Sequence, residues 1–361
     1  MYSRQTQRRL LLLLLLPAAW LIYASFTGTG GSDTRKGGKI ILMTYGRSGS
    51  SFTSDIIQRH PDVFYTFEPL HNLLRRHIGM MEDKNNFWYS NQTRDRYDRE
   101  SVSIMEVFLS CSYETMRSND INNYQLRNSK DSRLLWGCAQ LKRNFTALAI
   151  LDCFLYARRI CASRPVNLVK TIRFRGSAAA EMMARHDELK ILYLIRDPRG
   201  TINSQRRVFR NFDRNQIQNF SKEYCQRFRE DLVNLEPLFD KYPDRMKLLR
   251  YETLAENPMK VSEEMYKFLG LEFTADVRDF VFNITSAGQR SKNAYGTSKP
   301  NSTEAAYAWR RGVTLFEAQT IDATCSDIYL KLGYLPVHSE QELRSWNYSL
   351  KRSVVFHGTV I

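Results

Sequence analysis

The expected architecture follows from one segment, Lys39-Ile-Ile-Leu-Met-Thr-Tyr45-Gly46-Arg47-Ser48-Gly49-Ser50-Ser51-Phe52. Its first half is a short apolar run, which is typical of a buried strand in a parallel sheet. Its second half is a Gly/Ser turn that opens a helix predicted over 50–59. A helix N-terminus binds anions through its free N–H groups and its dipole, and glycine lets the backbone approach a phosphate closely. We therefore expect an anion-binding loop made of Arg47, Ser48, Gly49, Ser50, Ser51 and Phe52.

A second strand end carries a similar pattern. The apolar run 189–195 leads into Arg196-Asp197-Pro198-Arg199, and Ser204 follows within the next predicted helix. Ligands of open α/β sheets bind at the carboxyl ends of the strands. We therefore expect Arg196 and Ser204 to reach the same anionic ligand as the first loop. Each motif alone is equally typical of an ordinary solvated turn.

Apolar runs alternate with helical patterns along the chain, which predicts an α/β protein with three layers around a central parallel sheet. No linker composition interrupts 39–336, so we expect one catalytic domain over 39–337 and a C-terminal extension over 338–361. The pattern is weak from about residue 72 to 142, where we expect helices and loops that cover the site. The predicted strands are 39–45, 63–67, 166–172, 189–195 and 246–251, and the predicted helices are 50–59, 101–111, 145–161, 176–185, 258–269 and 315–332.

The N-terminus has the features of a membrane anchor. Three arginines precede an apolar run over 10–26, and about 17–25 apolar residues span a bilayer. This pattern predicts a cytoplasmic tail over 1–9, one transmembrane helix over 10–26 and a flexible stem over 27–38. A cleaved signal peptide is the alternative, because Ala18 and Ala19 are small. Either way, the body of the chain lies outside the cytoplasm.

Sequons and cysteines agree with that location. An even number of scattered cysteines without a C-x-x-C pair predicts disulfides rather than a zinc site, and six cysteines leave fifteen pairings open. The N-x-S/T sequons begin at Asn91, Asn144, Asn219, Asn283, Asn301 and Asn347, and the cysteines are Cys111, Cys138, Cys153, Cys161, Cys225 and Cys325.

The chain is strongly basic, with a formal net charge of +15 and a pI near 9.6. Anionic partners are therefore expected. Nucleic acid, acidic lipid, a phosphorylated cofactor and an acidic polysaccharide all fit this sign of charge. A basic soluble surface without a specific partner fits it as well.

Taken together, the two motifs resemble those of the sulfotransferases. The loop 47–52 is similar to their 5′-phosphosulfate loop, and Arg196-Asp197-Pro198-Arg199 with Ser204 is similar to their 3′-phosphate site. The blocks 45–52, 60–65, 67–70 and 250–258, with Trp309-Arg310, Cys325 and 332–334, resemble the Golgi galactose, N-acetylglucosamine and N-acetylgalactosamine 6-O-sulfotransferases. The resemblance is poor over 75–142.

This resemblance implies a P-loop-NTPase-like sulfotransferase fold and 3′-phosphoadenosine 5′-phosphosulfate (PAPS) as the sulfuryl donor. It implies that the acceptor is a sugar 6-hydroxyl in keratan sulfate, chondroitin sulfate or a related glycan. It also implies a single-pass type II protein of the Golgi membrane with a lumenal catalytic domain. Nucleic acid is then not a partner, and a homo-oligomer is compatible with the sequence.

The resemblance also assigns roles to residues. Arg47 takes the place of a catalytic Lys and would stabilise the leaving phosphate by charge, since a guanidinium does not give up its proton. Glu68, directly after the strand 63–67, is the expected base for the acceptor hydroxyl, and His71 is the alternative base. A structural ion pair is the other interpretation of Glu68.

Basic residues elsewhere have more than one interpretation. Arg173 and Arg175 follow a third strand end, and together with His71 they are expected to contact the acceptor. A solvated charged face is the alternative for both arginines. By the same resemblance, Trp309 with Arg310 and Arg311 would close over the nucleotide, and packing of Trp309 in the core is the alternative. No His, Cys and carboxylate cluster has metal-ligand spacing, so we expect no metal.

Two other classes of protein fit parts of the pattern. A P-loop kinase or NTPase would need Lys-Ser/Thr after the loop, where this chain has Gly49-Ser50-Ser51. A membrane-anchored protein that binds anionic glycans without catalysis would use the positive charge. That interpretation leaves the two strand-end motifs unexplained.

Overall fold

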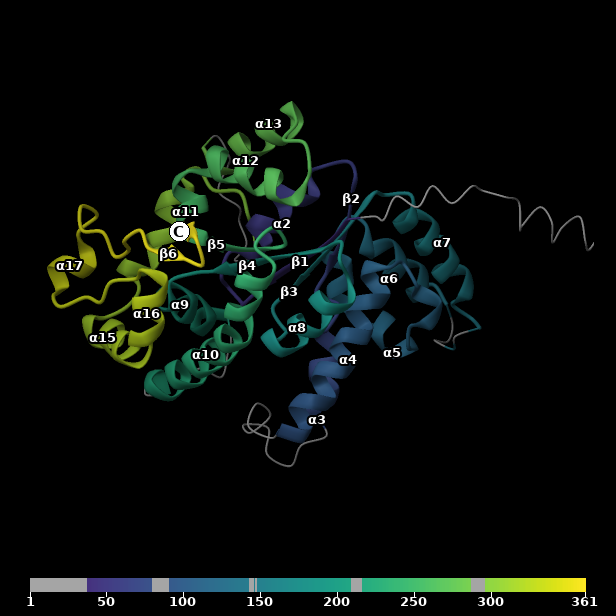
Figure 1. Ribbon diagram of the computed structural model, residues 1–361, viewed down its shortest axis with the longest axis horizontal. Helices are drawn as coiled ribbons and strands as arrows, with labels where there is room; N and C mark the ends of the chain where they lie inside the picture. The colour runs from purple at the N-terminus through teal and green to yellow at the C-terminus, as the bar shows by residue number, and fades with distance from the viewer. Residues whose placement is uncertain (1–37, 80–90, 143–145, 147, 209–215, 287–295) are drawn as a thin grey trace, which may run out of the picture. The chain divides into compact units, whose positions relative to one another are not determined.

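A computed structural model describes residues 38–79, 91–142, 146, 148–208, 216–286 and 296–361. At its centre is a sheet of five parallel strands in the order β2-β3-β1-β4-β5 (Figure 1). In the middle strand, Ile41 pairs with Val169 on one side and Ile191 on the other. The strands are β1 (Gly38–Thr44), β2 (Val63–Phe67), β3 (Val166–Thr171), β4 (Leu189–Ile195) and β5 (Met246–Arg250).

Alternate residues of each strand point into two separate cores, because successive side chains of a strand face opposite sides of the sheet. In β1, Ile40 and Leu42 belong to one core, and Ile41 and Met43 belong to the other. The first core is completed by α2 (Ser50–Gln58), α12 (Pro258–Leu269) and α13 (Ala275–Thr285). The second core is completed by α4 (Asn91–Leu109), α7 (Leu151–Ala162), α8 (Gly176–Arg185), α10 (Ile217–Lys241) and α16 (Ser326–Leu332).

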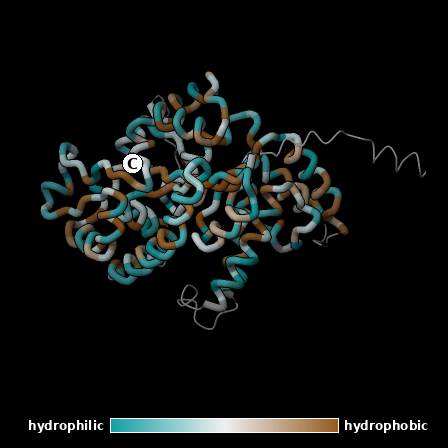
Figure 2. The backbone as a smooth tube through the Cα atoms, in the orientation of Figure 1, coloured by the Kyte–Doolittle hydropathy of each residue, from teal (hydrophilic) through white to brown (hydrophobic). Residues whose placement is uncertain are grey.

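In Figure 1, α12 and α13 lie above the sheet, and α8 and α10 lie below it. Figure 2 shows hydrophobic residues concentrated along the central strands between these helices. The predicted three-layer α/β architecture with a central parallel sheet is therefore confirmed. The remaining elements are α3 (His71–Gly79), η2 (Tyr113–Thr115), α5 (Ser118–Ile121), η3 (Tyr124–Asn128), α6 (Ser132–Gln140), α9 (Pro198–Val208), α11 (Tyr251–Glu256), α14 (Ser302–Tyr307), η5 (Ala308–Arg311), α15 (Leu315–Thr324), α17 (Glu340–Arg344) and the hairpin β6 (Val355–Phe356) and β7 (Thr359–Val360).

The prediction of a single late helix over 315–332 is wrong, because two helices occupy that stretch. Helix α15 ends at Thr324 and α16 begins at Ser326. Between them, Cys325 leaves the helical conformation (φ −108°, ψ 16°) and forms a disulfide with Cys225 of α10. Other helices also differ from the prediction. Helix α7 begins at Leu151 rather than near residue 145, the helix predicted over 101–111 is the second half of α4, and no helix was predicted where α10 lies.

All six cysteines form disulfides, as the sequence predicted. The pairs are Cys111–Cys161, Cys138–Cys153 and Cys225–Cys325. The second bond lies within the loop that the first one closes, so both restrain the helices between residues 111 and 161. The third bond joins α10 to the segment between α15 and α16.

The two ends of the chain differ in what the structure describes. Among the described residues, no helix is both long and apolar enough to cross a membrane. The predicted transmembrane helix over 10–26 lies outside those residues. At the other end, the predicted extension 338–361 packs against the domain, because Phe356 and Ile361 are buried in the second core and Leu343 and Leu350 pack with Trp309.

Candidate anion-binding and catalytic site

The two sequence motifs meet at one edge of the sheet. The loop 46–52 follows β1 and Arg196 follows β4, and these two strands are neighbours. The chain order also reverses here, since β2 and β3 lie on one side of β1, and β4 and β5 lie on the other. Such a switch point opens a crevice at the carboxyl ends of the strands, where α/β proteins bind ligands.

The loop after β1 presents the start of α2 to this crevice. Helix α2 begins at Ser50, and its N-cap Gly49 has φ 89° and no capping side chain. The first N–H groups of an α-helix have no partner within the helix. Arg47 also has a positive φ of 70°, which is uncommon for a residue with a Cβ and is found mostly where function constrains the backbone.

Arg47, Ser204 and Arg196 are joined directly. Arg47 Nε donates to Ser204 Oγ at 3.0 Å, and Arg196 Nη1 donates to the Arg47 carbonyl at 3.0 Å. Arg196 Nη2 donates to the Ala306 carbonyl, which leaves the buried Nε without a partner among the described residues. The two strand ends therefore lie together, as predicted. The buried Nε–H of Arg196 has the chemistry to donate to a further acceptor.

The aromatic ring of Tyr251 packs against one side of the loop. The Tyr251 ring lies 4.7 Å from the Arg196 guanidinium carbon and packs edge-on against Phe52. A Cβ placed on Gly49 would lie 2.2 Å from Tyr251 Cδ2. Gly49 is therefore required both by its backbone angle and by the close approach of this ring.

Glu68 lies at the carboxyl end of β2, two strands from the loop, and is buried. Its Oε1 accepts from Lys170 Nζ at 2.7 Å and from the Ile172 N–H at 3.1 Å, and its Oε2 accepts from Arg173 Nη1 at 2.6 Å. Burial is the largest single influence and would raise the pKa of Glu68, but the attraction of Lys170 and Arg173 and the hydrogen bonds from Lys170 and Ile172 together outweigh it, so the pKa lies below its ordinary value. Glu68 is therefore an ionised carboxylate at neutral pH.

His71 begins α3, one turn after Glu68, and its ring is half-buried. Neither ring nitrogen has a hydrogen-bond partner among the described residues, and the ring packs edge-on against Tyr124. Burial, together with Arg173 and Arg75, lowers the pKa of His71 to about 4. His71 is therefore a neutral imidazole at pH 7, with one donor and one acceptor to offer.

The two arginines after β3 differ in their surroundings. Arg173 retains some exposure (16%) beside Glu68. Arg175 is buried and pairs with Asp98 at 3.2 Å and with Glu230 at 3.7 Å. An acceptor would have to displace these carboxylates to reach Arg175. Arg173, by contrast, pairs with Glu68, which is itself the expected base.

Two residues near the site have contacts that the sequence did not predict. Lys170 is a buried lysine within the otherwise apolar strand β3, and a charge in such a strand is the clue that was available. Arg199 is fully buried between Asp197 and Asp322, and its guanidinium lies 4.9 Å from the Trp309 ring. These contacts fix the turn after β4 that carries Arg196.

Trp309 and Arg310 are both buried and pack inside the fold. Trp309 is buried against Gly200, where an added Cβ would lie 2.8 Å from its ring. The Arg310 guanidinium donates to four backbone carbonyls, which belong to Glu342, Leu343, Ser345 and Tyr348. Arg310 thus holds the C-terminal segment, and Trp309 supports α9.

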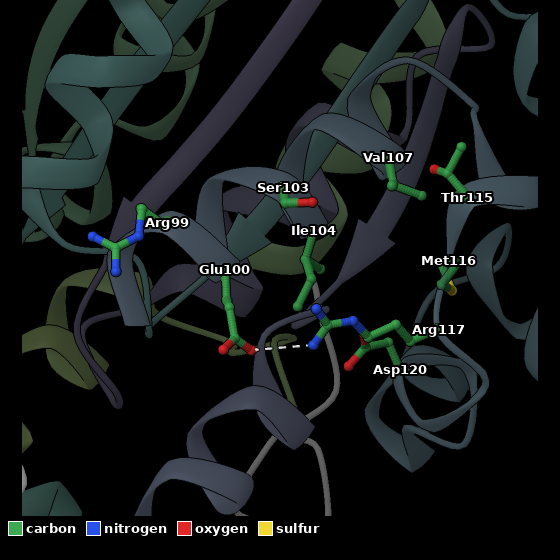
Figure 3. A pocket seen from close by; sticks show the side chains of 9 residues that line it. All are labelled: Arg99, Glu100, Ser103, Ile104, Val107, Thr115, Met116, Arg117 and Asp120. Atoms are coloured by element: carbon green, nitrogen blue, oxygen red, sulfur yellow. Dashed lines mark hydrogen bonds and ion pairs between the residues drawn. The ribbon is translucent and has the colours of Figure 1, made fainter. Parts of the chain in front are cut away.

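Two cavities lie outside the crevice itself. One, of about 280 Å³, adjoins α9 one turn beyond Ser204 and is lined by Arg207, Lys299, Pro300, Asn301, Glu304, Ala305, Ala308, Arg311 and Gly312. Figure 3 shows the other, of about 260 Å³, between α4 and the segment 115–120. Its carboxylates are already paired, Glu100 with Arg117 and Asp120 with Arg76.

Among the described residues, no group of three or more His, Cys, Asp or Glu side chains is arranged to hold a metal ion. The positive charge of the crevice comes instead from Arg47, Arg196, Lys170 and Arg173. These guanidinium and ammonium groups suit an anionic ligand with several negative oxygens.

Comparison with known proteins agrees with this chemistry. A model of the "Sulfotransferase family" matches residues 40–275. Carbohydrate sulfotransferase 1 of Rattus norvegicus is 28% identical over 354 residues, which cover 85% of this chain and 81% of that protein. Carbohydrate sulfotransferase 6 of Homo sapiens is 25% identical, with 85% and 83% covered. Carbohydrate sulfotransferase 3 of Tetronarce californica is 26% identical, with 91% and 80% covered.

Proposed function

Because the chain belongs to the sulfotransferase family, we propose that it transfers the sulfuryl group of PAPS to the 6-hydroxyl of a galactose, N-acetylglucosamine or N-acetylgalactosamine residue in a glycan. Its relatives by sequence are carbohydrate sulfotransferases, so the enzyme is one as well. The observation that carries the proposal is the junction of Arg47, Ser204 and Arg196 at the ends of β1 and β4.

The donor is held at two places in this proposal. The loop 47–52 binds the 5′-phosphosulfate with the first N–H groups of α2, as helix N-termini bind phosphates. Arg196 and Ser204 bind the 3′-phosphate, and the unpaired Arg196 Nε has the chemistry for it. The basic cavity beyond Ser204, with Arg207 and Arg311 in its wall, extends this end of the donor site.

Glu68 is the base for the acceptor hydroxyl. A carboxylate has about four lone-pair positions, and three donors occupy the sides facing Lys170, Ile172 and Arg173. Oε2 accepts from Arg173 and also from the Ile172 N–H at 3.3 Å, and Arg173 is the partner of Glu68 that retains some exposure. An acceptor hydroxyl that donates to Oε2 would therefore lie between Glu68 and the phosphate loop, with Arg173 and the neutral His71 contacting the sugar.

Transfer then needs no covalent enzyme intermediate. The acceptor oxygen forms a bond to sulfur while the bond from sulfur to the phosphate oxygen breaks, and Glu68 takes the hydroxyl proton. Arg47 faces the negative charge that develops on the leaving phosphate. Most of the catalysis comes from this positioning and charge stabilisation, as in phosphoryl transfer. The products are the sulfated glycan and adenosine 3′,5′-bisphosphate (PAP).

We place the enzyme in the Golgi membrane as a single-pass type II protein, anchored by residues 10–26. The three disulfides suit an oxidising lumen. The four sequon asparagines whose burial the structure describes are all exposed, namely Asn219, Asn283, Asn301 and Asn347. A homo-oligomer is compatible with this arrangement, and light scattering of the detergent-solubilised chain measures it.

The direct test incubates the purified full-length chain with ³⁵S-labelled PAPS and a panel of keratan and chondroitin oligosaccharides. Mass spectrometry and NMR of the labelled product are expected to locate the sulfate on a 6-hydroxyl. Glycan binding without any transfer of label would instead identify a glycan-binding protein. Transfer of ³²P from ATP would identify a kinase.

The Gly49→Ala variant is expected to bind PAP poorly. Its Cβ would collide with Tyr251, and its φ of 89° is strained for alanine. Residues held in such conformations cost of order 1–3 kcal/mol, so the affinity should fall roughly 10- to 100-fold. Calorimetric titration with PAP measures it. The matched control is Gly137→Ala on α6, where an added Cβ meets nothing within 4 Å, and equal affinities for the two variants would contradict this role of Gly49.

A further inference from the structure

The short segment after β3, Ile172-Arg173, is fixed on both of its edges. On one edge, the Ile172 N–H and the Arg173 guanidinium both donate to Glu68. On the other edge, the two carbonyls accept hydrogen bonds from helices, since Arg227 Nη2 donates to Ile172 O at 2.9 Å and Tyr97 Oη donates to Arg173 O at 2.7 Å. The position of Glu68 therefore depends on a backbone segment that α10 and α4 hold from behind.

Arg227 also contacts the strand that leads into the phosphate loop. Its guanidinium carbon lies 5.1 Å from the ring of Tyr45, the residue immediately before Gly46. One helical turn later, Asp231 accepts from Tyr45 Oη at 2.7 Å and from the Gly176 N–H at 2.7 Å. The Arg227 Nε and Asp231 Oδ2 atoms are 4.0 Å apart. One face of α10 thus contacts both the end of β1 and the segment that holds Glu68.

We propose that Arg227 is a positioning residue that sets the spacing between the donor loop and the carboxylate of Glu68. The inference rests on the proposed sulfuryl transfer and adds a residue that acts through the Ile172-Arg173 segment and Tyr45. Its guanidinium has two functions at once, because it donates to the Ile172 carbonyl and packs on the Tyr45 ring. Glutamine in its place has a donor but is too short to reach the Ile172 carbonyl, so only Tyr97 would still hold the Ile172-Arg173 segment from this side, while Asp231 still holds Tyr45.

Arg227→Gln is therefore expected to lower kcat for glycan sulfation by roughly 10- to 100-fold, the range that a displacement of about 1 Å produces. The KM for PAPS and the affinity for PAP should stay within about twofold, because the loop and Arg196 are unchanged. Arg227→Lys keeps the charge with a single donor group and is expected to recover part of the activity. Arg229→Gln is the matched control, since Arg229 is on the same helix and pairs with exposed Asp327.

A combined variant separates positioning from a purely structural role. If Arg227 acts through Glu68, adding Arg227→Gln to Glu68→Gln should lower kcat by less than about twofold further, because effects within one unit are not additive. Additive losses, or parallel losses of kcat, PAP affinity and melting temperature, would overturn the proposal. Unchanged kcat in Arg227→Gln would overturn it too. The wild-type reaction in the same assay reports independently on the proposed function.

Discussion

The Arg47→Ala variant is expected to lose about 10²- to 10³-fold in kcat, which is the usual effect of removing one preorganised group that stabilises transition-state charge. Arg47 is the cation of the loop after β1, and its Nε is fixed by Ser204 at 3.0 Å. The group is therefore oriented before the reaction, and alanine removes it without changing the glycine and serines of the loop. Initial rates with labelled PAPS and an active oligosaccharide measure the effect.

Two further variants make the Arg47 result interpretable. Arg47→Lys keeps a positive charge but loses the forked donor group, so its activity should lie between the wild type and Arg47→Ala. Arg59→Ala removes an arginine just after the same helix, where it pairs with exposed Asp276, and it should leave kcat unchanged. Wild-type turnover in a folded Arg47→Ala variant would remove Arg47 from the mechanism.

Glu68→Gln is expected to lower kcat by about 10²- to 10⁴-fold, the range for removal of a general base. The amide retains the shape of the side chain and still accepts from the Ile172 N–H, but it does not take a proton. Affinity for PAP should change little, since Glu68 lies two strands from the loop. Steady-state rates and PAP titration measure the two effects separately.

The control for Glu68→Gln is Glu114→Gln, which removes a partly exposed carboxylate that pairs with Arg158. His71→Ala is compared in the same assay, because His71 is the alternative base. Its low pKa, about 4, makes it a weak base, so we expect a smaller loss than from Glu68→Gln. A larger loss in His71→Ala would move the role of base from Glu68 to His71.

Glu68 also predicts a dependence of stability on pH. Its pKa in the folded protein lies below its ordinary value of 4.5, so its ionisation stabilises the fold above pH 4.5, and this contribution is lost as the pH falls through the folded pKa. The free energy of unfolding of the wild type should therefore fall more steeply below pH 4.5 than that of Glu68→Gln. Urea denaturation at a series of pH values measures both slopes, and equal slopes would contradict the ion cluster around Glu68.

The sheet was predictable because its strands are short apolar runs. The strands β2 and β4 have the predicted bounds, β3 and β5 end one residue earlier, and β1 is shifted by one residue at both ends. The convergence of the two strand-end motifs was predictable for the same reason, since parallel neighbours bring their carboxyl ends together. The break at Cys325 was not, because it depends on a disulfide to Cys225, 100 residues earlier.

The partners of charged side chains were the least predictable part of the site. Arg173 and Arg175 follow the same strand end and are only two residues apart, yet one pairs with Glu68 and the other with Asp98. Arg227 is 55 residues from Ile172 in sequence. The hydrophobic pattern of its helix shows which face is buried, but it does not show that Arg227 donates to the Ile172 carbonyl. Burial and long-range pairing decide these roles, and neither can be read from local sequence.

The nested disulfides between residues 111 and 161 restrain a segment that contacts the strand end carrying Glu68. Side chains of this segment bond to the backbone of β2 and of Glu68, through Ser129, Asp131 and Asn123. Its shape is maintained by covalent cross-links of its own, Cys111–Cys161 and Cys138–Cys153. Two nested cross-links therefore restrain the side chains that hold the carboxyl end of β2 and the backbone of Glu68.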